Sequence, residues 1–351
     1  MTVSPRPPSA FAIAATLAML LAPMQATAPP IPATAPSFIA TVQLPEEGHA
    51  VSVNTLTGLG YVGMTDDLGV FGLDSYQVLN TIPLYAEGGY AIMPVAVNAC
   101  ANQLYTGSKV VNLATNAVAS LPAGGDDIAI NEQTNTIYFG RHSIYQNRPD
   151  VVNVVDGATN RKVATIEMGY SYYFQRVWVA VNPATNLVYA SYSGDNHLHV
   201  IDGASNTETT KVPIPYIGRV ALNPATNRIY VVSGTKTVVL DGNTLAELGQ
   251  IANFSSYLLV NPLTNRIYSL NIDLKVADGA TNQVVTTLNL PGGASGPALD
   301  PLRGRIYLAG AYADWRDKLM VIQDVPAPPN ATLTCPTVWR VYLPVVLKGS
   351  Q

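Results

Sequence analysis

The residue types that most often carry out catalysis are few in this sequence, and they are scattered. Its four histidines are His49, His142, His197 and His199, and its two cysteines are Cys100 and Cys335. The sequence contains no C-x-x-C-H, G-x-S-x-G or H-E-x-x-H segment, which removes the signatures of haem attachment and of the commonest hydrolases. We therefore expect no catalytic residues and no cofactor. A lyase-like or quinoprotein-like enzyme stays an alternative, because such enzymes draw their residues from many separate loops.

Two of the histidines have a spacing that could serve a metal ion. His197 and His199 alternate along an expected strand, so both imidazoles point to the same side, and Asp195 lies close by. No third ligand has a fixed spacing, so we interpret the segment as a half-exposed strand end rather than a metal site. The pairs Asp66-Asp67 and Asp126-Asp127 could contribute to a Ca²⁺ site, but neither lies in a D-x-D-x-D-G loop. Solvated loop carboxylates are the preferred interpretation.

Aromatic side chains offer a different chemistry, which is the binding of a ligand. They gather in irregular segments, where rings with arginines nearby could stack on a sugar or hold a peptide. The candidate binding residues are Tyr172, Tyr173, Arg176, Trp178, Arg219, Tyr257, Tyr312, Trp315 and Arg316. The alternative for some of these rings is that they fill gaps in the hydrophobic core.

The elements that must position these residues come from an internal repeat. It reads VAVNPATNLVY from Val179, VALNPATNRIY from Val220, LLVNPLTNRIY from Leu258 and PALDPLRGRIY from Pro297, with degenerate copies from Val51, Val95 and Ile128. The seven copies end at Tyr61, Tyr105, Tyr138, Tyr189, Tyr230, Tyr268 and Tyr307. The intervals between these tyrosines are 44, 33, 51, 41, 38 and 39 residues, with a mean of 41. That mean is the length of a four-stranded propeller blade.

A second repeated unit lies between the copies, reading VVNVVDGATNRKVATI from Val151 and KVADGATNQVVTTLNL from Lys275. The N-P-x-T-N and D-G-x-T-N segments favour tight turns, and the β-branched runs beside them favour strands. Each blade should hold strands A to D, with A innermost. The copy from Pro297 lacks a D strand, whereas the segment from Phe38 to Leu44 matches one, and pairing the two closes the ring. The sequence therefore predicts an all-β, seven-bladed β-propeller of four-stranded antiparallel blades.

These units resemble the YVTN-type (YncE-like) β-propeller repeats of exported bacterial and archaeal proteins, over roughly residues 38 to 324. The resemblance implies a WD40-like propeller. It implies no single function, because such propellers include surface-layer components and adhesion or binding modules. The first three copies depart from the pattern, since their turns lack the proline.

The expected strand order divides the connections between two faces. The D-to-A and B-to-C connections share one, here called the loop face, and the A-to-B and C-to-D turns share the other, the turn face. The loop face collects the aromatic segments and the insertions from Gly140 to Asp150 and from Ala311 to Lys318, and such loops usually carry binding. Cys100 and the tail that carries Cys335 should both lie on the turn face. A disulfide between them is geometrically possible, with free thiols or pairing to another chain as the alternatives.

The composition divides the chain into four parts. Residues 1–28 read as a signal peptide, because Arg6 precedes an apolar run from Ala10 to Ala22 and Ala26-Thr27-Ala28 offers a cleavage site. Residues 29–36 form a Pro/Ala/Thr spacer, residues 37–324 the propeller, and residues 325–351 a Pro-rich tail that is either a sorting signal or an extra strand. The apolar stretches at both ends are too short to span a bilayer, so we expect no transmembrane span in the mature chain.

The charge and composition of the chain limit the kinds of partner that it can bind. Charged residues make up 12% of the chain against roughly 25% in an average protein, and the net charge of −4 with no basic run argues against nucleic acid. We expect a monomer outside the cytoplasm, secreted or attached to the cell surface, that binds a protein, peptide or glycan at the cell envelope through its loop face. The alternatives are an enzyme that uses the same face and a structural cell-surface protein anchored by its tail.

Overall fold

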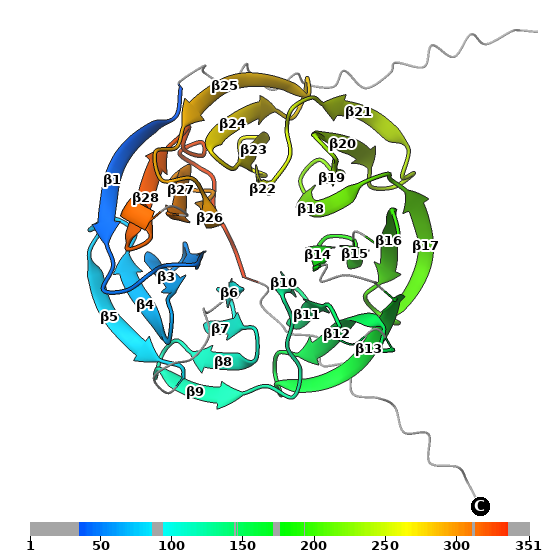
Figure 1. Ribbon diagram of the computed structural model, residues 1–351, viewed down its shortest axis with the longest axis horizontal. Coiled ribbons are helices and arrows are strands. Elements are labelled where there is room, and N and C mark those ends of the chain that lie inside the picture. The colour runs from blue at the N-terminus through cyan, green and yellow to red at the C-terminus, as the bar shows by residue number, and fades with distance from the viewer. Residues whose placement is uncertain are drawn as a thin grey trace, which may run out of the picture. The chain divides into compact units, whose positions relative to one another are not determined.

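The computed structural model shows a ring of seven sheets, each with four antiparallel strands (Figure 1). It describes residues 35–85, 94–143, 145, 147–170, 176–192, 194–310 and 313–335. Within those ranges, no helix has the length and apolar character needed to cross a bilayer. The short 3-10 helix η1 (Ala313–Trp315) lies between two strands of the last blade.

The blades follow one another along the chain, and in each the first strand lies nearest the centre of the ring. Blade 1 holds β2 (Ala50–Asn54), β3 (Leu59–Gly63), β4 (Asp67–Gly72) and β5 (Val78–Pro83). Blade 2 holds β6 (Val95–Asn98), β7 (Gln103–Thr106), β8 (Lys109–Asn112) and β9 (Ala117–Ser120). Blade 3 holds β10 (Asp127–Asn131), β11 (Thr136–Arg141), β12 (Asp150–Asp156) and β13 (Arg161–Gly169). Blade 4 holds β14 (Val177–Asn182), β15 (Leu187–Tyr192), β16 (His197–Asp202) and β17 (Thr207–Pro213).

The remaining blades repeat the arrangement. Blade 5 holds β18 (Ile217–Asn223), β19 (Arg228–Ser233), β20 (Lys236–Asp241) and β21 (Glu247–Ile251). Blade 6 holds β22 (Tyr257–Asn261), β23 (Arg266–Leu270), β24 (Asp273–Asp278) and β25 (Gln283–Asn289). Blade 7 holds β26 (Ser295–Asp300), β27 (Arg305–Ala309), β28 (Lys318–Gln323) and, as its outermost strand, β1 (Ser37–Gln43).

The predicted closure of the ring by an N-terminal strand is confirmed. β1 pairs antiparallel with β28, with Phe38 opposite Ile322 and Val42 opposite Leu319 (Figure 1). The strand begins and ends one residue earlier than the predicted segment. Because both ends of the chain contribute to one sheet, blade 7 forms only when distant parts of the sequence meet.

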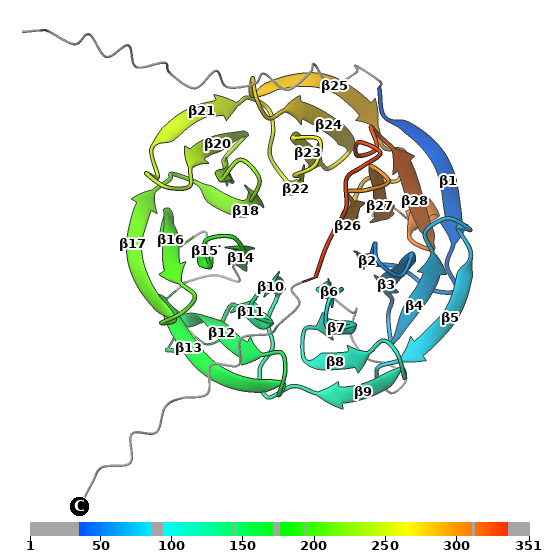
Figure 2. The same ribbon diagram turned by 180° about the vertical axis from the view of Figure 1, so that it is seen from behind.

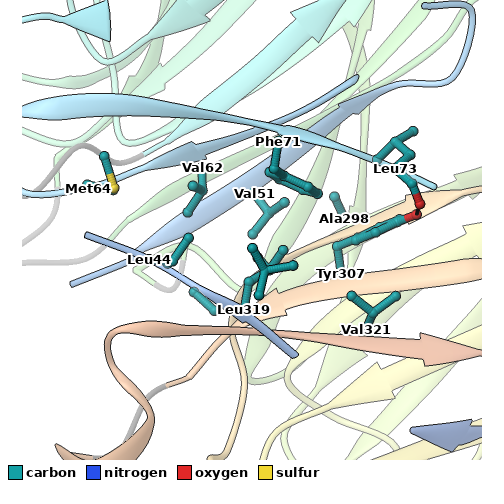
Figure 3. Packing of buried hydrophobic residues seen from close by; sticks show 12 residues of the cluster. Leu44, Val51, Val62, Met64, Phe71, Leu73, Ala298, Tyr307, Leu319 and Val321 are labelled. Atoms are coloured by element: carbon teal, nitrogen blue, oxygen red, sulfur yellow. Dashed lines mark hydrogen bonds between the residues drawn. The ribbon is translucent and has the colours of Figure 1, made fainter. Parts of the chain in front are cut away.

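Buried side chains fill the seams between neighbouring blades. At the seam of blades 7 and 1, Phe71 and Tyr307 lie with ring centroids 5.6 Å apart, beside Leu44 and Leu319 (Figure 3). The seven repeat tyrosines are all buried. Tyr307 donates its hydroxyl to the backbone oxygen of Leu73 in blade 1, at 3.1 Å, and burial raises the pKa of Tyr307 to about 12. The repeated tyrosine therefore belongs to the contact between one blade and the next.

In blades 2 to 5, the buried asparagine that ends the inner strand has two roles. Its Oδ1 accepts from the backbone of its own A-to-B turn, as Asn182 does from Ala184 at 3.0 Å. Its Nδ2 donates to an asparagine in the turn of the following blade, as Asn182 does to Asn227 at 2.9 Å. The same bridge joins Asn98 to Asn135, Asn131 to Asn186 and Asn223 to Asn265 at 2.7 to 2.8 Å. The N-P-x-T-N unit is therefore both a turn and a link between blades.

The acceptor asparagines require a particular backbone. Asn135, Asn186, Asn227 and Asn265 all have φ between 51° and 56°, a left-handed conformation that asparagine adopts more readily than most residues. The glycine of the D-G-x-T-N unit packs against the same side chain, since a Cβ at Gly242 would overlap the Asn227 side chain. The two repeated turns of a blade therefore fit together because one carries glycine.

The end of blade 7 differs from the other blades. Gln323 occupies the position of the aspartate that begins the D-G-x-T-N turn elsewhere, and Asp324 occupies that of the glycine. The buried Asp324 carboxylate pairs with Arg266 and accepts from the Tyr268 hydroxyl at 2.7 Å. Both partners belong to blade 6. The buried ion pair therefore fixes the last strand of the ring to its neighbour at the point where the tail begins.

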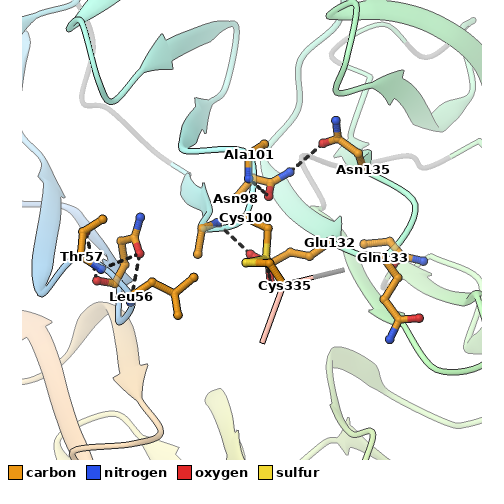
Figure 4. Close-up of a disulfide and its surroundings, with 12 residues drawn as sticks. Leu56, Thr57, Asn98, Cys100, Ala101, Glu132, Gln133, Asn135 and Cys335 are labelled. Atoms are coloured by element: carbon orange, nitrogen blue, oxygen red, sulfur yellow. Dashed lines mark hydrogen bonds between the residues drawn. A yellow bond between two sulfur atoms is a disulfide. The ribbon is translucent and has the colours of Figure 1, made fainter. Parts of the chain in front are cut away.

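The tail crosses the turn face and is bonded to blade 2. From Asp324 it runs toward the centre of the ring (Figure 2), and Ala327 donates its backbone N–H to the Leu302 oxygen at 3.0 Å. Cys335 forms a disulfide with Cys100 in the β6–β7 turn (Figure 4). Glu132 of blade 3 accepts from the backbone of Ala99 beside the disulfide, and burial raises its pKa. The described part of the tail is thus held at both ends.

Candidate ligand-binding face

One position of the inner strand differs most from blade to blade. It lies four residues before the turn-capping residue, at the loop-face end of the strand. In blades 7, 1 and 2 it is occupied by Gly296, Ala50 and Pro94, which are small or lack a polar side chain. In blades 3 to 6 it is occupied by Asp127, Trp178, Arg219 and Tyr257. We call these four residues the inner-strand arc.

The inner strands point this position toward the next blade. Asp127 accepts from the backbone N–H of Val179 in blade 4 at 3.0 Å. Arg219 of blade 5 places its guanidinium carbon 4.2 Å from the centroid of the Tyr257 ring in blade 6. Four consecutive blades therefore contribute an acid, an indole, a guanidinium and a phenol at equivalent positions of the ring.

The electrostatics of the arc centre on Asp127. Burial raises the pKa of this carboxyl, and the positive charges of Arg219 and Arg176 oppose that shift. The Arg219 guanidinium on the Tyr257 face forms a cation–π pair that is worth more as water is removed. A ligand that covers the arc would strengthen these interactions, because it would lower the local dielectric.

Trp178 adds an unused donor. Its Nε1 atom is buried and has no hydrogen-bond partner in the part of the chain that the structure describes. The rest of the side chain is half-buried. Because Nε1 is buried, a ligand can stack on the half-buried indole but reaches its N–H only if neighbouring groups move.

The predicted binding residues divide into three groups. Arg176, Trp178, Arg219 and Tyr257 belong to the arc or act on it electrostatically. Tyr172, Tyr173 and Tyr312 lie outside the described residues. Trp315 and Arg316 lie in the β27–β28 connection of blade 7, on the same face.

The two residues of blade 7 have structural contacts. Trp315 is half-buried against the cluster between blades 6 and 7, to which Tyr257 also packs, and a Cβ at Gly292 would overlap its ring. Arg316 forms an ion pair with Glu47 at 3.3 Å. Trp315 therefore packs in the seam between blades 6 and 7, as Tyr257 does, and the binding role of Trp315 and Arg316 stays a prediction.

The histidine pair of β16 is engaged by carboxylates. His199 is fully buried, with Nδ1 2.5 Å from Glu208 and Nε2 2.9 Å from Asp195. His197 lies 3.2 Å from Asp195 through Nδ1, so both rings do face the same side. No group of three or more metal-binding side chains occurs among the residues described. Asp195 is shared by the two imidazoles, which explains its presence beside them.

The aspartate pairs differ from the solvated carboxylates expected. Asp126 accepts from the backbone of His142 at 2.9 Å and lies 2.5 Å from its Nδ1, whereas Asp127 turns to blade 4. The two carboxylates therefore have different partners, His142 for Asp126 and the backbone of Val179 for Asp127. Asp67 begins β4, and the backbone oxygen of Asp66 accepts from Leu84 at 3.2 Å.

Comparison with known proteins rests on structure alone. No protein-family model matches this chain, and no curated protein matches it. A chain of the crystal structure of the mitotic checkpoint complex is similar with a TM-score of 0.68 and 15% identity, covering 89% of this chain and 99% of that one. The β-propeller domain of Myceliophteria thermophila Cps50 (Swd1) is similar with a TM-score of 0.65 and 11% identity, covering 83% and 100%. The fold is a seven-bladed β-propeller. At these identities the likeness shows the fold and nothing finer.

Sequence reasoning missed Asp127 as a member of the arc. The signal was present, because aligning the seven inner strands on their last residue puts Asp127, Trp178, Arg219 and Tyr257 in one column. Aromatic content alone does not select Asp127, because it distinguishes residues by type and not by position in the ring.

Proposed function

We propose that this propeller is a binding module that holds its ligand on the loop face, over the inner-strand arc. The observation that carries the proposal is the asymmetry of one ring position, which is polar or aromatic in four consecutive blades and small or apolar in the other three. Packing alone favours similar residues at equivalent positions of a repeat, whereas an off-centre ligand favours this division.

The chemistry of the arc suits a protein, a peptide or a glycan. Tryptophan, tyrosine and arginine are the residues that contribute most to binding energy at interfaces, and rings also stack on sugars. A binding role fits better than catalysis, because the one carboxylate of the arc already accepts a backbone N–H and no general base contacts the Tyr257 phenol among the described residues. One of the similar structures is a protein assembly, the mitotic checkpoint complex, which is consistent with a protein ligand.

We further propose that the chain is an exported member of the YVTN-type propellers that acts at the cell envelope. The repeated N-P-x-T-N and D-G-x-T-N units support the family, and the disulfide supports an oxidising compartment. An anchoring role for residues 336–351 is compatible with this proposal, since the disulfide at Cys335 attaches the tail to the propeller.

Binding can be tested with a glycan array and with solubilised cell-envelope fractions. We expect the Trp178→Ala and Arg219→Ala variants to lose binding, whereas Leu56→Ala and Arg161→Ala, which are exposed turn-face changes of similar type, keep it. A chain that ends at Cys335 should also keep it. Equal binding by all four variants would overturn the proposal that the ligand binds over the arc. If binding is lost only when residues 336–351 are removed, the tail is the binding element.

A further inference from the structure

A hollow lies between blades 2 and 3, and no residue of the inner-strand arc lines it. Every strand of blade 2 has four residues at most, whereas β12 and β13 of blade 3 have seven and nine. Blade 2 therefore ends before it covers the facing sheet of blade 3. The uncovered space has a volume of about 800 Å³ and is called here the blade 2–3 groove.

The walls of the groove are firmly held. Asn153 on its floor donates to the Gly124 oxygen at 3.3 Å and accepts from Thr165 at 3.2 Å. The connection from β9 to β10 forms one wall and lies close against blade 2. This close approach requires glycine at position 124, because a Cβ there would overlap the Gly107 oxygen. On the opposite wall, the buried Asp150 carboxylate accepts from the backbone of Ser143 at 2.7 Å, which fixes the start of the β11–β12 insertion.

Three positively charged side chains line the groove. Arg141, Arg148 and Lys162 are exposed lining residues, and none of the three has an ion-pair partner within the described ranges. Arg148 is oriented by Tyr145, with its guanidinium carbon 5.3 Å from the ring centroid. The one acid in the lining, Asp126, is paired with His142. A chain with a net charge of −4 thus concentrates three free cations in one hollow.

The shape of the groove distinguishes between anionic ligands. Its floor is a sheet face on which Asn153 and Thr165 present side chains, so an extended peptide on this floor would meet side chains and not backbone hydrogen-bonding groups. Its lining contains three glycines, two serines, Asn153, Thr165 and one exposed aromatic ring, Tyr145, which suits a polyhydroxylated ligand better than apolar side chains. The volume accommodates a short oligosaccharide.

We propose that the blade 2–3 groove binds an acidic oligosaccharide, with Arg141, Arg148 and Lys162 pairing with its carboxylate or sulfate groups. The groove shares no lining residue with the inner-strand arc, so this site stands independently of the proposed function.

The test is titration calorimetry of the full chain at low salt with four probes. These are tetragalacturonate, a sulfated tetrasaccharide, a neutral chitotetraose and hexaglutamate. We expect saturable binding of one or both acidic sugars, weaker binding in 0.5 M NaCl because exposed charges are screened, and none of chitotetraose. The acidic sugar that binds more tightly shows whether the groove prefers carboxylate or sulfate groups. Binding of hexaglutamate in preference to both acidic sugars would overturn the proposal, as would equally tight binding of the neutral sugar that Trp178→Ala leaves unchanged and that therefore does not occur at the arc.

Matched variants place the binding in the groove. Lys162→Ala should weaken the affinity for the acidic sugar about threefold to fivefold. The double change of Arg141 and Arg148 to alanine should weaken it at least about tenfold. Arg161→Ala is the control, because Arg161 is the exposed neighbour of Lys162 on β13 and does not line the groove. Trp178→Ala should leave this affinity unchanged, which separates the groove from the arc. Equal losses in Lys162→Ala and Arg161→Ala would show non-specific charge attraction and refute the site.

Discussion

Replacing Asn182 with alanine should destabilise the propeller by more than the loss of a turn cap. The side chain is 2% exposed, accepts from its own turn and donates to Asn227 in the next blade. Alanine removes both interactions and leaves the Asn227 oxygen without its donor. The change therefore separates the local role of the repeated asparagine from its role between blades.

The magnitude follows from counting these interactions. A net hydrogen bond contributes about 1 kcal/mol, and a buried polar atom left unsatisfied costs about 1–3 kcal/mol. Since Asn227 is half-buried and water can reach it in part, we expect the free energy of unfolding to fall by about 2–3 kcal/mol in Asn182→Ala. For a propeller of this size that is a fall in Tm of about 4–6 °C.

Asn112 provides a matched control. It caps the β8–β9 turn by accepting from Ala114 and Thr115 at 3.0 and 3.1 Å, but it is exposed and makes no contact with another blade through this cap. Asn112→Ala should cost about 0.5–1 kcal/mol, because it loses the turn cap alone.

The assay is equilibrium unfolding in guanidinium chloride, followed by tryptophan fluorescence, with the disulfide kept oxidised in all samples. The bridging role predicts a difference of at least about 1 kcal/mol between the two variants. If Asn182→Ala and Asn112→Ala destabilise the chain equally, the asparagine acts only within its own turn and the argument for bridges between blades is refuted.

Three further predictions concern single features. Replacing both Cys100 and Cys335 with serine should lower the free energy of unfolding by about 5 kcal/mol in the chain-entropy account of a bridge that spans 235 residues; unchanged guanidinium midpoints would contradict this. Asp324→Asn should cost about 3–5 kcal/mol, because it removes the carboxylate that pairs with the buried Arg266 side chain, and a smaller loss than in Tyr268→Phe would count against it. Because burial raises the pKa of Asp127 in the folded chain, this group supports folding most below the pKa of the unfolded chain, and its contribution is lost as pH rises. Wild type should therefore lose stability relative to Asp127→Asn between pH 4 and pH 7 in urea unfolding, and the opposite trend would show that the arginines outweigh burial.

The fold could be predicted because each blade repeats its own local signals. The tyrosine intervals give the number of blades, and the turn residues give the strand boundaries within a residue or two. The closing strand was also visible, since blade 7 lacked one strand and the segment at Phe38 was spare. These signals are local in the sequence, although the contacts that they create are not.

The roles between blades could not be predicted in the same way. An asparagine in a tight turn is fully explained by its own backbone, so nothing in the sequence called for the bridge from Asn182 to Asn227. Trp315 has the composition of a binding residue but packs in a seam, because its position depends on how blades 6 and 7 meet. The groove depends on a difference in length between blades 2 and 3. The intervals of 33 and 51 residues recorded that difference, but only the ring shows which surface it uncovers.

The disulfide between Cys100 and Cys335 also decides how the molecule would carry a mechanical load. A pull on the chain beyond residue 335 passes through the sulfur atoms directly to blade 2, so everything between the two cysteines lies in a closed covalent loop and bears no tension. That loop contains β7, β8 and β9 of blade 2, blades 3 to 6 and the three strands of blade 7 that follow them. For a load across both ends of the chain, the first element in the path is β1, which is held by its pairing with β28, by the Gln43–Asp317 hydrogen bond and by the packing of Val42. Extension would therefore begin by peeling this outer strand, while the inner-strand arc stays intact.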